Sequence, residues 1–84
     1  MNLIDYKMLQ TAVALVVDAH VTTRTDGGRV YDYSEATASA CNWLGCDPAT
    51  ALGNLVDGMI VDAVEERFGS ALPDSRLTPE TPAP

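Results

Sequence analysis

The sequence is poor in the side chains that bind metals or cross-link a small domain. It holds two cysteines, Cys41 and Cys46, and one histidine, His20, among 84 residues. A structural zinc site needs four ligands, commonly supplied by closely spaced cysteine pairs, and the sequence has no such pair. A disulfide between the two cysteines would close a very short loop, so we predict free, buried thiols in a reducing compartment. We therefore expect no metal and no cofactor.

Positive charge is also scarce. Lysine and arginine total 5 against 12 aspartates and glutamates, which gives a net charge of −7 at pH 7. The basic residues are scattered along the chain: Lys7, Arg24, Arg29, Arg67 and Arg76. Proteins that bind nucleic acid place lysine and arginine on the phosphates, and anionic membranes attract the same groups. We therefore expect neither nucleic acid nor a membrane as a partner, and favour a protein with a basic or apolar patch.

Long apolar runs are missing as well. The longest strictly apolar run covers residues 12–17, whereas a helix that crosses a bilayer needs ~20 apolar residues. A secretory signal fits poorly, because Asp5 and Gln10 interrupt the leader and Asp18 lies beside the only small-residue cleavage site. We expect the protein in the cytoplasm, or in the virion if it is a phage structural protein.

Groupings of residues that perform catalysis are lacking too. Nucleophilic catalysis needs a thiol or hydroxyl beside a base and an orienting group, and His20 is the only histidine that could serve two thiols. Glu65 and Glu66 are adjacent in a predicted helix, so their carboxylates point in different directions. Gly27 and Gly28 belong to a predicted turn rather than to a phosphate-binding loop. We expect that the protein is not an enzyme.

The patterns that are present predict a mainly α-helical fold with a minor β part. A chain of this length forms one domain, which we place at residues 1–69, and a proline-rich tail follows at 70–84. Apolar spacing predicts a first helix at 3–20. The β-branched residues within 13–17 make a strand at that position an alternative. Two β-prone runs flank Asp26-Gly27-Gly28 and predict a β-hairpin at 21–33.

Capping residues predict a short and then a long helix after the hairpin. Ser34 is a candidate N-cap, and Gly45 is a candidate C-terminal cap, so the short helix spans 34–44. Asp47 and Pro48 suit the start of the next helix, which continues to about residue 68 and stops before Gly69. Its apolar residues repeat at three and four positions, which is typical of an amphipathic helix.

Self-association is expected from the composition. Apolar residues make up 46% of a short chain, so we predict that a second surface supplies extra stability. Gly53 and Gly58 each cost about 1 kcal/mol relative to alanine inside a helix, and Ala49 and Gly53 suggest close packing of another helix. Trp43 is expected in the core, with an interface as the alternative. The candidate interface residues are small, apolar or aromatic: Ala49, Leu52, Gly53, Val56, Met59, Ile60, Tyr31, Tyr33 and Trp43.

Residues 40–55, ACNWLGCDPATALGNL, resemble the helix-turn-helix segment of bacterial transcription regulators. The shared pattern is a helix, Leu-Gly, a small apolar residue, a capping residue, and Pro-Ala-Thr opening a second helix. The resemblance implies that the first turns of the second helix would read DNA bases. Those turns offer only Thr50 and Asn54 for base contacts and no lysine or arginine for a phosphate. Asn54 also stands where the pattern has an apolar residue, so we prefer two helices joined by a tight turn.

The order of strand, helix and helix is also similar to ribbon-helix-helix dimers, in which the strands pair across the dimer and enter the major groove. The corresponding parts here are residues 29–33, 34–44 and 48–68. The strand would present Arg29, Tyr31 and Tyr33 on one side. One arginine per subunit gives little affinity for DNA, so the resemblance favours self-association over DNA reading.

The amino-acid usage, with arginine in excess of lysine and abundant alanine, valine, aspartate, threonine and glycine, is similar to that of small uncharacterised proteins of actinobacteria and their phages. We predict a non-enzymatic, acidic interaction protein that self-associates, such as a phage accessory or inhibitory protein or a virion component. Its partner would be a host or virion protein. The alternative is a DNA-binding regulator of the helix-turn-helix or ribbon-helix-helix type.

Overall fold

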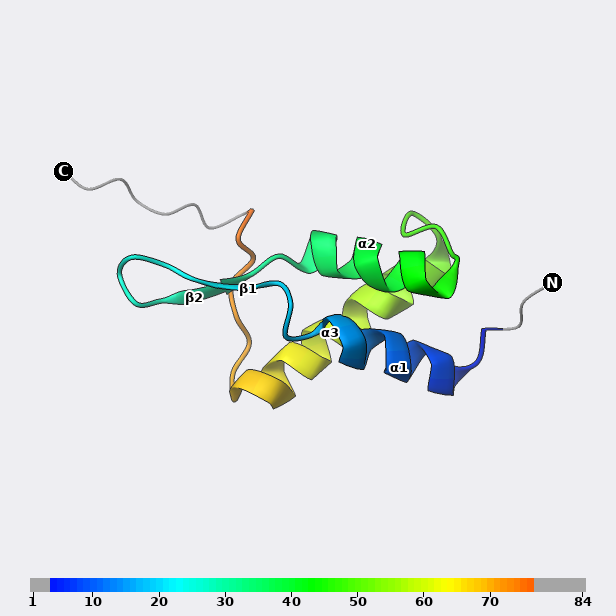
Figure 1. Ribbon diagram of the computed structural model, residues 1–84, viewed down its shortest axis with the longest axis horizontal. Helices are drawn as coiled ribbons and strands as arrows, with labels where there is room; N and C mark the ends of the chain where they lie inside the picture. The colour runs from blue at the N-terminus through cyan, green and yellow to red at the C-terminus, as the bar shows by residue number, and fades with distance from the viewer. Residues whose placement is uncertain (1–3, 77–84) are drawn as a thin grey trace.

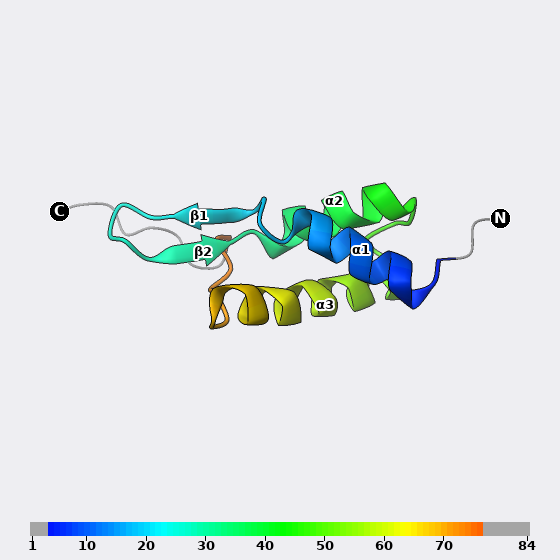
Figure 2. The ribbon, with the colours of Figure 1, turned by 60° about the horizontal axis from the view of Figure 1, so that its bottom comes forward.

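Three helices pack around one core, and a β-hairpin projects from one end of them. The computed structural model describes residues 4–76. In chain order the elements are α1 (Tyr6–Val16), β1 (Val21–Thr23), β2 (Arg29–Tyr31), α2 (Tyr33–Leu44) and α3 (Ala51–Phe68). Figures 1 and 2 show the hairpin extending beyond the ends of α1 and α3. The predicted fold class, mainly α with a minor β part, is confirmed.

Helix α1 is shorter than the predicted helix at 3–20. Its N-cap is Asp5, whose carboxylate accepts a hydrogen bond from the Met8 backbone N–H at 2.8 Å. The helix ends at Val16, because the chain must reverse into the hairpin, where the His20 carbonyl accepts the Asp32 N–H at 3.0 Å. Residues 13–16 are helical, so the alternative of a strand at 13–17 is wrong. Residue 3 lies outside the described residues.

The predicted hairpin at 21–33 is confirmed. Strands β1 and β2 pair antiparallel, with Val21 opposite Tyr31. Gly27 in the connecting turn has a φ of 89°, which glycine adopts without the steric cost that a Cβ would bring. The Asp26 carboxylate accepts the Gly28 N–H at 2.9 Å and fixes the turn. Local residue chemistry therefore decides where the chain reverses.

Helix α2 begins one residue earlier than predicted, and its N-cap is Asp32 rather than Ser34. The Asp32 carboxylate accepts the Glu35 N–H at 3.0 Å. Asp32 directly follows β2, so its backbone is not yet helical when its side chain reaches the first turn of the helix. The predicted end of the helix is confirmed, with Gly45 in the left-handed region at a φ of 78°.

Helix α3, unlike α2, begins later than predicted, at Ala51 instead of Pro48. Asp47 and Pro48 form a preceding turn, in which the Asp47 carboxylate accepts the Ala49 N–H at 2.9 Å. The N-cap is Thr50, whose hydroxyl accepts the Gly53 N–H at 3.3 Å. A Cβ at Gly53 would lie only 2.6 Å from the Pro48 Cα. The chain's own turn, and not another helix as predicted, therefore packs on Gly53.

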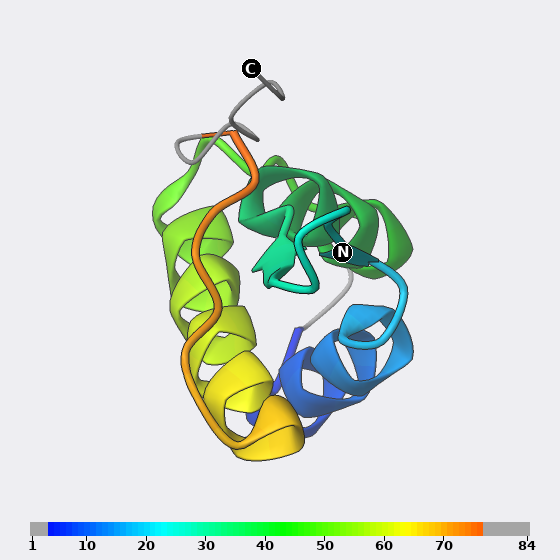
Figure 3. The same ribbon diagram turned by 90° about the vertical axis from the view of Figure 1, so that its left-hand side faces the viewer.

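The core lies where the three helices meet, and all three pairs of helices are in contact. Figure 3 looks along the bundle and shows α1, α2 and α3 arranged around a common centre. Helix α1 contributes Leu9 and Val13, and the C-terminal segment contributes Leu72. The fully buried helical side chains come mainly from α2 and α3: Ala12, Ala36, Ala40, Cys41, Val56, Ile60 and Val64.

The segment after α3 runs across the molecule and passes the base of the hairpin (Figure 1). The Tyr31 N–H donates to the Pro73 carbonyl at 2.9 Å, and the Ser75 N–H donates to the Tyr31 carbonyl at 3.0 Å. These bonds make a parallel bridge between Tyr31 and Asp74, so β2 is paired on both edges. Residues 70–76 of the predicted tail therefore take part in the fold, and residues 77–84 lie outside the described residues.

Tyr31 is fully buried at the centre of an aromatic cluster. Its hydroxyl donates to the Val16 carbonyl at 3.3 Å, and its ring centroid lies 4.8 Å from that of Tyr33 and 6.4 Å from that of Phe68. Burial, and to a smaller extent the negative charges of Tyr33 and Asp18, together raise the pKa of Tyr31 to about 12. The fold therefore favours the protonated phenol.

The two interior glycines of α3 differ in the room around them, so they make a matched pair of variants. A Cβ at Gly58 meets nothing within 4 Å, and we expect Gly58→Ala to raise the free energy of unfolding by about 0.5–1 kcal/mol. We expect Gly53→Ala to lower it by about 1–3 kcal/mol, because the methyl group would overlap the Pro48 backbone. Urea unfolding measures both; stabilisation by Gly53→Ala would contradict this packing.

Alkaline pH tests the burial of Tyr31. The unfolded phenol titrates near its usual pKa of 10.0 and the folded one near 12, so the unfolded chain loses its proton first. The free energy of unfolding should therefore be unaffected by this group below pH 10.0 and fall by about 3 kcal/mol between pH 10.0 and about 12. Tyr31→Phe should flatten this decline in urea unfolding.

At neutral pH, Tyr31→Phe should lower the free energy of unfolding by about 1 kcal/mol, because the Val16 carbonyl loses its hydrogen-bond donor. Tyr6→Phe is the control, since Tyr6 is 64% exposed and its phenol meets solvent. Equal pH dependence in the two variants would show that Tyr31 does not carry the effect.

Candidate functional site

The predicted interface residues do not share one exposed face. Three of them belong to the monomer's own core and are 0% exposed: Tyr31, Val56 and Ile60. Gly53 is buried beneath the Pro48 backbone. Leu52, Met59 and Tyr33 are partly buried. Ala49 and Trp43 are exposed. The apolar stripe of α3 therefore packs against α1 and α2 and is not exposed to a partner.

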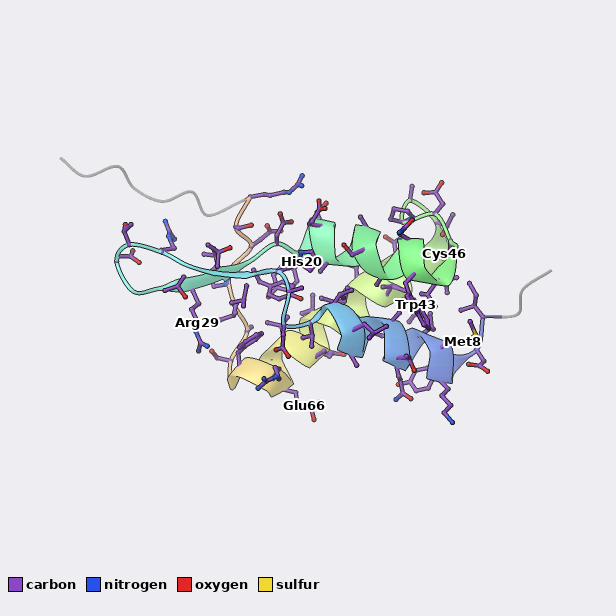
Figure 4. All side chains as sticks on the ribbon, in the orientation of Figure 1. Met8, His20, Arg29, Trp43, Cys46 and Glu66 are labelled. Atoms are coloured by element: carbon purple, nitrogen blue, oxygen red, sulfur yellow. The ribbon has the colours of Figure 1, made fainter. Side chains whose placement is uncertain are left out.

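Trp43 is 51% exposed, so the prediction that it fills the core is wrong. Helix α2 buries Ala36, Ala40 and Leu44, which are spaced four residues apart and form one stripe. Trp43 lies one residue outside that stripe and projects at the edge of the helix. In Figure 4 it lies at the end of the molecule where Met8 of α1 is also seen. Its exposure is consistent with the alternative of an interface position.

A groove runs along the surface between α1 and α3, which lie side by side in Figure 2. It has a volume of about 580 Å³ and is open to solvent. The residues in its floor are buried or partly buried: Val13 and Val17 from α1, and Met59 and Ala63 from α3. We call this feature the α1–α3 groove. It offers an apolar floor that neither helix covers.

The two rims of the α1–α3 groove differ in charge. On the α1 side the exposed rim residues are uncharged: Tyr6, Gln10 and Ala14. On the α3 side Asp62 and Glu66 are four residues apart, so their carboxylates lie on the same side of the helix. Figure 4 shows Glu66 pointing away from the molecule. The groove is therefore apolar inside and acidic along one rim.

An ion pair closes one end of the groove and leaves that acidic rim uncompensated. Arg67 Nε lies 3.0 Å from Asp18 Oδ1, and both side chains are 59% exposed. In the described part of the chain, the other ion pairs join Arg76 to Asp32 and Glu35. Within residues 4–76 no cation is therefore paired with Asp62 or Glu66, and both carboxylates can bind a cation supplied by a partner.

A second hollow, of about 440 Å³, lies between α2, α3 and the C-terminal segment. Its polar groups are bonded within the fold. The Thr37 hydroxyl donates to the Asp57 carboxylate at 3.2 Å, and the Tyr33 hydroxyl donates to the Leu72 carbonyl at 2.5 Å. Burial, together with Asp74 and Asp57, raises the pKa of Tyr33. These bonds hold the C-terminal segment against the helices.

The cysteines and the histidine do not assemble into a catalytic site. Figure 4 places His20 where α1 leads into the hairpin and Cys46 in the turn after α2, at opposite ends of the helices. His20 is therefore too far away to act as a base for Cys46. Among residues 4–76, no three histidine, cysteine, aspartate or glutamate side chains come together as a metal site would require.

Comparison with protein-family models, with curated proteins and with solved structures finds no match. In the described segment, no helix combines the length and the apolarity needed to cross a bilayer.

Sequence reasoning missed most of the groove, because a groove depends on how two helices pack. Only Met59 of its lining was among the predicted interface residues. A signal was present in α3, where the alternation of Met59 and Ala63 with Asp62 and Glu66 places apolar and acidic residues along one edge of the helix. In α1, Gln10 and Ala14 lie between buried residues, and this pattern is as weak a sign of the groove as the one in α3.

Proposed function

We propose that the protein is a non-enzymatic interaction domain that binds a basic, amphipathic helix of another protein in the α1–α3 groove. The observation that carries the proposal is the combination of an open apolar floor with a rim whose carboxylates, Asp62 and Glu66, have no cation of their own within the described chain. A host or virion protein is the kind of partner that the amino-acid usage predicts.

A helix suits the shape and the chemistry of this groove. Binding of an amphipathic helix in an apolar groove buries one face of the helix and leaves its backbone bonds satisfied internally. Ala14 on the rim and Ala63 in the floor are small, so an incoming helix can approach closely. Lysine or arginine beside the apolar face would meet Asp62 and Glu66. The net charge of −7 would also attract such a partner over longer distances.

The charge of α3 supports a protein partner over DNA. A helix-turn-helix reading would direct the exposed face of α3 toward the major groove. That helix carries no lysine or arginine before Arg67, and Asp62, Glu65 and Glu66 are exposed on it. Carboxylates repel phosphates, whereas DNA readers gain affinity from cations at these positions. On the edge away from β1, strand β2 is already bridged at Tyr31 to Asp74, which occupies part of the edge that a ribbon-helix-helix dimer would use for strand pairing.

Two designed peptides test the groove. Both form a helix with the same apolar face, and the residues beside that face are arginine in one and glutamate in the other. We expect the arginine peptide to bind and to shift the amide NMR signals of residues 59–67 and of Ala14, and the glutamate peptide to leave them unchanged. Replacing Asp62 and Glu66 by Asn and Gln should weaken binding about two- to tenfold at low salt, with a smaller effect at high salt.

A matched pair of variants locates the binding surface. Ala14→Arg places a long cation on the groove rim, and we expect it to abolish binding of the arginine peptide. Ala38→Arg adds the same side chain to an exposed alanine of α2, outside the groove, and should bind as the wild type does. Binding that is equally strong in both variants, or that shifts signals of α2 only, would contradict the proposal.

Self-association, which the composition predicts, would need a different surface. Two copies that met at the α1–α3 groove would bring their acidic rims together. The exposed Leu55 of α3 and the outer edge of β1 are the surfaces available to a second copy. Light scattering should report a discrete multimer, favoured by salt because salt screens the repulsion between chains of charge −7.

The same measurement on a chain that ends at Arg76 shows whether association depends on residues 77–84. The truncation is placed there because Leu72 is buried and Pro73 and Ser75 are bonded to Tyr31. A multimer in both chains would support association through residues 1–76. A monomer at all salt concentrations would contradict self-association without affecting the proposal for the groove.

A further inference from the structure

Two thiols are brought together at the C-terminal end of α2. The Gly45 N–H donates to the Asn42 carbonyl at 3.3 Å, and the Cys46 N–H donates to the Cys41 carbonyl at 2.9 Å. These two bonds form a Schellman cap, in which the side chains at the two outer positions commonly pack against each other. Both outer positions are cysteine here, and the Cys46 thiol is close enough to contribute to the raised pKa of the Cys41 thiol.

We propose that Cys41 and Cys46 form a dithiol site that reacts with low-molecular-weight disulfides, such as oxidised glutathione, to close a disulfide within the chain. The proposal goes beyond the proposed function, because it uses no residue of the α1–α3 groove.

The helix cap brings Cys41 and Cys46 close together, although their spacing in the sequence does not indicate this. Residues 41 and 46 enclose a short loop, and along an extended chain they would be far apart. Gly45, with a φ of 78°, turns the backbone back on the last turn of α2, and the bond from Cys46 to the Cys41 carbonyl holds the two residues beside each other. A disulfide requires Cβ atoms about 3.5–4.5 Å apart, and the backbone bond of the cap holds the two cysteines where a side-chain adjustment can bring their sulfurs together.

The difference in exposure sets the order of events. Cys46 is half-buried and lies in the turn that Figure 4 shows after α2, whereas Cys41 is fully buried. The Cys46 thiolate attacks one sulfur of oxidised glutathione, forms a mixed disulfide and releases one glutathione thiolate. Cys41 then loses its proton, attacks the Cys46 sulfur and releases the second glutathione. The two protein thiols are oxidised by two electrons, and the glutathione disulfide is reduced to two thiols, which take up the two protons.

The second step should be the slower one near neutral pH. Burial, and to a smaller extent the Cys46 thiol and the charges of Cys46 and Asp47, together raise the pKa of Cys41 to about 11. Only the thiolate attacks a disulfide, so the mixed disulfide on Cys46 should accumulate briefly and close faster as the pH rises. Asp47 is the carboxylate that faces the pair.

Intact-mass spectrometry of the full chain in glutathione redox buffer tests the site. The wild type should lose the mass of two hydrogen atoms after a transient glutathione adduct. Cys41→Ser, which cannot close the ring, should keep one glutathione on Cys46. Cys46→Ser should react at least about tenfold more slowly than Cys41→Ser, because its remaining thiol is buried. Cys41→Ala replaces Cys41→Ser if the buried hydroxyl prevents folding.

A comparison with the unfolded chain shows whether the cap is responsible. In urea the cap is absent, and we expect the mixed disulfide of the wild type to close at least about tenfold more slowly than in the folded protein at the same pH. Equal rates in the two states, a wild type that keeps the glutathione adduct, or disulfides formed only between chains would each overturn the proposal.

Discussion

The burial of Tyr31 is the interaction on which the arrangement of the other parts depends. Its backbone is bonded to Pro73 and Ser75, its hydroxyl donates to the Val16 carbonyl, and its ring lies against Phe68 at the end of α3. One residue of β2 thus joins the end of α1, the end of α3 and the C-terminal segment. Because α1 and α3 are both fixed to it, the spacing between them that forms the α1–α3 groove is fixed as well.

Local signals in the sequence predicted those features that depend on neighbouring residues. The Asp26-Gly27-Gly28 turn and the left-handed glycines Gly45 and Gly69 act within a few residues, and the hairpin and both helix ends were predicted from them. The helix starts were predicted less well, because several residues could cap. Asp32 caps α2 in place of Ser34 because β2 ends there, and Thr50 caps α3 because the turn at Pro48 packs on Gly53. Both choices follow from tertiary contacts.

The candidate site was less predictable than the fold for a related reason. An amphipathic pattern tells which side of a helix is buried, but not which neighbour buries it or where two helices leave a gap. Val56 and Ile60 were assigned to an interface from their spacing, and the same spacing serves the monomer's core, where both are fully buried. Trp43 was assigned to the core because the chain has few aromatic residues, although its position outside the stripe of Ala40 and Leu44 indicated exposure.

The distribution of the remaining apolar surface argues for partner binding at one place rather than for general stickiness. Large exposed apolar side chains are spread over all three helices: Tyr6, Leu15, Trp43, Leu55 and Val61. Single exposed residues of this kind are normal on a monomer. Only Tyr6 adjoins a groove whose floor is also apolar and whose other rim is acidic. A partner must then supply apolar and basic groups in register, and this double requirement would give a domain with so few distinctive side chains its specificity.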